Sequence, residues 1–144
     1  MTPSQVFLLA NALVMPQWLL MIFGPKWKIT NWLSAYYPIP AILAVLYFFY
    51  IFNGEAKLDP NSFSTLEGVK NLFATGGDTG MLAGWIHYLC FDLMTGCWIL
   101  NDSKQKGINH FAVIPCLFFC FMLGPIGFLL YLIIRFFFMG KVEG

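Results

Sequence analysis

The sequence predicts an all-α membrane protein, a bundle of four transmembrane helices with a short amphipathic surface helix between helices two and three. Three observations lead to this prediction. Of the 144 residues, 59% are apolar and only 10% are charged, whereas soluble domains are about 25% charged. Four apolar stretches approach or exceed the roughly 20 residues that a spanning helix needs. A more polar segment separates the second stretch from the third.

The four expected spans form a single transmembrane domain, residues 1–144, because this length is typical of one domain. The first basic residue, Lys26, follows the first apolar stretch, and we therefore expect a retained span rather than a cleaved secretory signal. Residues 124–127, Gly-Pro-Ile-Gly, lie inside the last stretch and are expected to kink it. The spans are expected at about residues 5–23, 33–52, 80–100 and 111–138.

A short helix is expected at about residues 64–75, in the polar segment. Ser64 and Glu67 have the spacing of a capping box. Apolar residues then recur at helical spacing, at Leu66, Val69 and Leu72. Two placements remain open: the helix lies on the membrane surface, or it packs over the mouth of the bundle.

The basic residues give no orientation in the membrane. With four spans, both termini and the polar segment share one side, and the two short loops lie on the other. Each side then carries four basic residues, so the positive-inside rule does not choose between them. The net charge of +1 and the lack of a basic stripe argue against a nucleic-acid partner. The basic residues are Lys57, Lys70, Arg135 and Lys141 on the first side and Lys26, Lys28, Lys104 and Lys106 on the second.

His87 and Asp92 are the polar residues near the middle of the third span. An ionised aspartate at that depth costs about 2.5 to 3.5 kcal/mol, so Asp92 should face protein. Five residues separate the two side chains by about 140° around a helix and about 7.5 Å along it. They should therefore have different neighbours. The expected partners are Asn11 and His110, which we assign with Asp102 to a second polar layer.

Asp102 and His110 flank the short loop that follows and are expected to meet at one membrane surface. That surface lies about 15 Å along the helix axis from Asp92. Two polar layers, rather than one cluster, argue against a di-metal site, as does the lack of glutamate in every span. The structural alternative is that these residues join helices by hydrogen bonds, at about 0.6 kcal/mol each.

The four cysteines all lie in apolar stretches, where packing is the favoured interpretation and a soft-metal site the alternative. No metal centre and no cofactor are expected. The sequence contains no P-loop, G-x-G-x-x-G, H-E-x-x-H or G-x-S-x-G motif, which excludes the corresponding enzyme classes. The cysteines are Cys90, Cys97, Cys116 and Cys120.

Several motifs resemble one small family of membrane proteins, that of the plant neoxanthin synthase, also named for abscisic-acid deficiency. The resemblance covers nearly the whole chain. It departs at Cys97, where an arginine is expected from the family pattern. The matching motifs are residues 11–16 (NALVMP), 66–69 (LEGV), 85–93 (WIHYLCFDL), 115–119 (PCLFF) and 122–127 (MLGPIG), together with Asp102 and His110.

This resemblance implies an isomerase that converts violaxanthin to neoxanthin without a redox cofactor. An epoxide opens and a proton leaves carbon to form an allene, which requires a general acid and a general base. His87 and Asp92 would supply these two groups. The side chains that would line the polyene site are Trp85, Tyr88, Phe91 and Trp98.

Two other functions remain open: a non-enzymatic protein for pigment binding or membrane-complex assembly, and a small transporter or proton path through His87 and Asp92. Membrane lipid or a carotenoid is the expected partner, and a homo-oligomer stays open. Because no transit peptide precedes the first span, a multi-pass protein of a bacterial inner membrane is expected.

Overall fold

The computed structural model describes residues 1–54 and 59–142, with side chains as far as Met139, and these residues contain helices and no strand. Lys57, counted above, lies outside the described residues. The helices are α1 (Pro3–Phe23), α2 (Lys28–Tyr36), α3 (Pro38–Asn53), the short 3-10 helix η1 (Pro60–Phe63), α4 (Leu66–Thr75), α5 (Gly77–Gln105), α6 (His110–Leu123) and α7 (Pro125–Val142).

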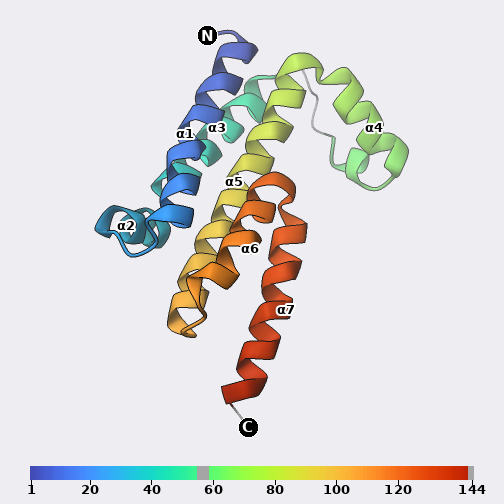
Figure 1. Cartoon of the computed structure of the whole chain (residues 1–144). Helices are drawn as coiled ribbons and strands as arrows, with labels where there is room; N and C mark the ends of the chain where they lie inside the picture. Colours follow the sequence, from blue (N-terminus) through green and yellow to red (C-terminus); the bar gives the residue numbers. More distant parts are fainter. Residues whose placement is uncertain (55–58, 143–144) are drawn as a thin grey trace.

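The long helix α5 is the centre of the molecule, and α1, α3, α6 and α7 all contact it. In Figure 1, α1 runs downward, α3 runs back upward, and α5 runs downward again. The core lies where the small and branched apolar side chains of α1, α5 and α6 meet, and Ala10, Leu93, Ile99 and Val113 are fully buried there. The predicted third span, 80–100, is thus the apolar part of a longer helix.

The predicted second span begins later than expected. Residues 33–36 belong to α2, and Tyr37 interrupts the helix with a left-handed backbone, φ 52°. Pro38 then starts α3. The proline disfavours a helical conformation for the residue before it, which explains the break at Tyr37. As a result α2 lies to one side of the bundle (Figure 1).

The prediction of one kinked helix over residues 111–138 is wrong. The chain reverses at Gly124, and α7 runs back beside α6 (Figure 1). A Cβ atom at Gly127 would overlap the backbone of Cys116 and Cys120, so α7 lies directly on the α6 backbone. The N-terminus and the end of α7 therefore lie at opposite ends of the molecule rather than at one end.

The surface helix exists as α4, but its cap is one residue later than predicted. The side chain of Thr65, rather than Ser64, accepts a hydrogen bond from the Gly68 backbone N–H at 3.0 Å. This helix projects from the upper end of α5 in Figure 1. Its apolar residues Val69 and Leu72 face α3 and α5 across a groove. None of the residues of α4 is buried.

The outward faces of α1 and α3 are apolar. Leu8 and Phe23 of α1, and Val45 and Phe48 of α3, are each more than 60% exposed. The stretches Pro3–Phe23 and Lys28–Asn53 are long and apolar enough to cross a membrane by length and composition, the second of them including the break at Tyr37. Exposed apolar surface of this extent is typical of a membrane-facing or protein-binding surface.

Candidate functional site

Asp92 lies against the turn that joins α6 to α7. The Cα of Gly124 is so close that an added Cβ would collide with the carboxyl group of Asp92. The thiol of Cys120 donates to the Asp92 carbonyl oxygen at 3.5 Å. Since α7 begins at Pro125, this carboxyl group lies at a helix N-terminus, where negative charge is stabilised. Its Oδ2 atom is buried and has no hydrogen-bond partner among the described residues.

Tyr88 lies four residues before Asp92 on α5 and contacts the connection between α6 and α7 from its α6 side. Its hydroxyl group donates to the carbonyl oxygen of Met122 at 3.0 Å and lies 3.5 Å from that of Phe121. Carbonyl groups in the last turn of a helix lack partners within the helix. The side chain expected to line a polyene site thus completes the hydrogen bonding at the end of α6.

His87 lies on a different side of α5, as its spacing from Asp92 predicted. Its ring centroid is 5.4 Å from that of Tyr47 on α3 and 4.8 Å from that of Phe91. Here α3, α4 and α5 enclose a groove of about 260 Å³. Its lining is mostly apolar, with two polar groups, the imidazole of His87 and the hydroxyl of Tyr47. The lining residues are Tyr47, Ile51, Phe63, Val69, Leu72, Phe73, Gly80, Gly84 and His87.

A second cavity of about 600 Å³ adjoins the groove, and both are lined by Phe73 and Gly84. Trp85 lines it and donates from Nε1 to Oδ1 of Asn11 at 3.3 Å. The amide of Asn11 in turn donates to the Phe7 carbonyl at 2.7 Å. The expectation that Asn11 pairs with the polar residues of the third span or joins the second polar layer is therefore wrong, because its side chain hydrogen-bonds to Trp85 and Phe7 instead.

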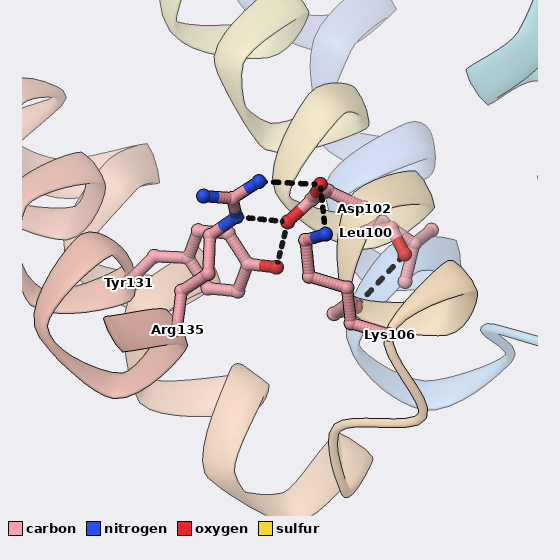
Figure 2. A network of polar contacts seen from close by, with 6 residues as sticks. Leu100, Asp102, Lys106, Tyr131 and Arg135 are labelled. Carbon is pink, nitrogen blue, oxygen red and sulfur yellow. Dashed lines mark hydrogen bonds and ion pairs between the residues drawn. The ribbon is translucent and has the colours of Figure 1, made fainter. Parts of the chain in front are cut away.

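The second polar layer is centred on Asp102, ten residues after Asp92 on α5. Figure 2 shows its carboxylate between Tyr131 and Arg135 of α7 and Lys106. The Tyr131 hydroxyl and Arg135 Nε donate to Oδ2 at 2.6 and 2.7 Å, and Arg135 Nη2 lies 3.4 Å from Oδ1. Lys106 Nζ is 3.9 Å from Oδ1. Burial opposes ionisation of Asp102, but these hydrogen bonds and cations together hold its pKa below the usual value.

His110 does not join this layer in the way expected. Its Nε2 forms a 2.8 Å hydrogen bond with the carbonyl oxygen of Ile22, so it connects α6 to α1. The predicted companion of Asp102 is thus wrong, and the actual companions, Tyr131 and Arg135, were missed. A signal was available: Arg135 is the only arginine of the chain and lies within an apolar run, where a charge usually has a partner.

The other expected site residues have packing contacts. The ring of Trp98 lies 5.7 Å from Phe128 and 5.5 Å from Tyr131, both on α7. Phe91 is 54% exposed. The cysteines are buried and free. Cys97 accepts a hydrogen bond from the buried amide of Gln17 at 3.0 Å. Within the described ranges, no three metal-binding side chains of His, Cys, Asp or Glu come together.

Fold and site define an all-helical protein with two stretches suited to crossing a membrane, an apolar groove containing one histidine, and a charged layer at the opposite end. The model of the ABA DEFICIENT 4-like protein family matches residues 5–131. This chain belongs to that family.

The chain is similar to the protein ABA DEFICIENT 4, chloroplastic, of Arabidopsis thaliana. The two are 28% identical over an alignment of 137 positions, and the match covers 86% of this chain and 57% of the plant protein. The chain thus spans little more than half of that relative's length. No solved structure matches.

Replacing Tyr88 with phenylalanine should destabilise the fold. The change removes the hydrogen bond to the Met122 carbonyl oxygen at the end of α6, and such a bond contributes about 0.5 to 1.5 kcal/mol. Thermal unfolding of the purified protein in detergent should show a lower Tm. Tyr36→Phe is the matched control, because Tyr36 is 72% exposed. Equal Tm values for the two variants would contradict the capping of α6 by Tyr88.

The Asp102→Asn variant should lack the part of the folding stability that comes from the ionised Asp102 side chain and is lost at low pH. Because the folded-state pKa of Asp102 is depressed, its contribution is present above the ordinary pKa near 4 and is lost as the pH falls through the lower folded value. The Tm of the wild type should therefore fall more steeply from pH 5 to pH 2 than that of the variant. At neutral pH the variant should be about 1 to 3 kcal/mol less stable. The exposed Glu67→Gln variant serves as control, and parallel pH profiles for wild type and Asp102→Asn would refute the prediction.

Proposed function

We propose that this protein is a multi-pass membrane protein that binds a carotenoid or related apolar isoprenoid in the groove between α3, α4 and α5, and isomerises it by acid–base chemistry. The observation that carries the proposal is the position of His87, an ionisable group in an otherwise largely apolar groove. Family membership supports the substrate class, through the resemblance to the neoxanthin synthase family.

The proposed membrane placement has three spans, α1, α3 and α5, and a re-entrant hairpin made of α6 and α7. The exposed apolar faces of α1 and α3 support it. Irregular backbone at membrane depth is tolerated only when protein or water satisfies its polar groups. The hydroxyl group of Tyr88 supplies such a partner to the Met122 carbonyl oxygen beside the turn at Gly124. An odd number of spans places the two termini on opposite sides of the membrane.

The form of the groove supports an elongated apolar ligand. Ligand sites are typically apolar with a few polar groups that fix orientation. The ring of Phe73 lies against Gly84, and these two residues line both the groove and the second cavity, which Phe7 and Trp85 also line. A long polyene could therefore lie across both, with its polar end group near His87 and Tyr47.

The chemistry of such a site is balanced without an oxidant. In the opening of an epoxide to an allene, the C–O bond breaks and the epoxide oxygen gains a proton. A carbon loses a proton, and its C–H electron pair forms the new double bond. An imidazole can serve as acid or base near neutral pH, and the Tyr47 hydroxyl is the second proton carrier in the groove. Asp92 lies against the α6–α7 turn, which supports a structural function for it instead.

His87→Gln should abolish turnover while leaving ligand binding intact. Loss of an acid–base group typically lowers the rate by about 10² to 10⁴-fold. Membranes containing each variant would be incubated with violaxanthin, with products and co-purified pigment measured by chromatography and absorbance. Asp92→Asn is the control on the other flank and should keep turnover in its folded fraction. Wild type that retains pigment but converts none would indicate a carrier and would refute the isomerase.

The two termini should be accessible from opposite sides of the membrane. Epitope tags at the N- and C-termini would be tested by protease digestion of spheroplasts and of inverted vesicles. We expect each preparation to lose one tag and protect the other. Loss of both tags from the same side would instead indicate four complete spans.

A further inference from the structure

One end of the molecule collects most of the basic side chains. Helix α2 and the last turn of α5 meet there, because Lys104 Nζ donates to Oδ1 of Asn31 at 2.6 Å. The return of α7 adds Arg135 to this end. We call it the basic end; its described basic side chains are Lys26, Lys28, Lys104, Lys106 and Arg135.

Acidic groups are distributed in the opposite way. Among the described side chains, the opposite end holds Asp59, Glu67 and Asp78, with Lys70 paired to Glu67 at 3.7 Å. The acid of the basic end is Asp102, which Arg135 neutralises at 2.7 Å. Lys26 and Lys28 are exposed and have no ion-pair partner within the described part of the chain. The lysines of the basic end are therefore largely uncompensated.

Helix α2 adds exposed aromatic rings to the basic end. Trp27, Trp32 and Tyr36 are 60%, 50% and 72% exposed, while Thr30 and Ser34 face the bundle and are fully buried. This helix lies beside the lower end of α1 in Figure 1. Tryptophan and tyrosine favour the level of lipid headgroups, where a ring meets both water and hydrocarbon.

We propose that the basic end binds the anionic headgroups of the leaflet it faces, with the lysines at the lipid phosphates and the rings of α2 at headgroup level. This inference rests on the membrane placement proposed above. Lysine clusters beside membrane helices attract anionic lipid. By the positive-inside rule, the basic end and the end of α7 face the cytoplasm.

The test measures lipid selectivity in reconstituted phosphatidylcholine vesicles. Electron paramagnetic resonance of spin-labelled phosphatidylglycerol and phosphatidylcholine gives the motionally restricted fraction of each lipid at the protein. We expect the wild type to favour phosphatidylglycerol by roughly two- to fivefold at low salt. The preference should fall toward one in Lys26→Gln/Lys28→Gln and, for the wild type, in about 1 M salt.

Two controls separate charge at this end from general effects. Lys70→Gln, at the opposite end, and Lys26→Arg/Lys28→Arg should both keep the preference. A wild-type preference of one, or a preference that neither salt nor the glutamine variant reduces, would overturn the inference. If alkaline carbonate extracts the protein from the vesicles, the membrane placement fails together with it. An inserted protein without selectivity overturns this inference alone.

Discussion

The close contact between α5 and the turn at Gly124 is the constraint on which the rest of this structure depends. Gly124 lies directly against the carboxyl group of Asp92, and Tyr88 satisfies carbonyl oxygens at the end of α6. The Gly124 carbonyl oxygen also accepts a hydrogen bond from the Phe128 N–H at 3.1 Å, so two carbonyl groups at the turn have donors although it lies inside an apolar run. Because the chain reverses here, α7 follows α5 as far as Asp102, where Arg135 and Tyr131 fix its far part.

The helices and their polar layers could be predicted from the sequence because both are local properties. Apolar runs indicate the helices, and the rise per residue separates Asp92 from Asp102 along α5. The reversal at Gly124 is not local. An apolar run without a polar loop has the hydropathy of a single span, and the groups that allow the turn belong to another helix, about thirty residues earlier. No pattern within residues 111–138 indicates those partners.

The incorrect partners of Asp102 and His110 follow from the same missing reversal. If residues 111–138 formed one span, Arg135 would lie at the opposite membrane surface from Asp102, and His110 would be the nearest candidate. Once α7 returns, Arg135 is brought to Asp102, and His110 is free to bond the Ile22 carbonyl. The same change moves the charge of Arg135 to the basic end. The equal division of basic residues between two sides therefore depended on the number of spans.

Asp92 and His87, on two flanks of α5, have surroundings that differ in how easily they can rearrange. On the flank of Asp92, the hairpin is held by a glycine contact, a thiol and a tyrosine hydroxyl, and a ligand there would have to displace backbone. On the flank of His87, the short helices η1 and α4 line the groove opposite α3 and α5, through side chains such as Phe63, Leu72 and Phe73. Side chains change rotamer at much lower cost than a packed hairpin reverses. The proposed site beside His87 can therefore change shape while the hairpin keeps α5 in place.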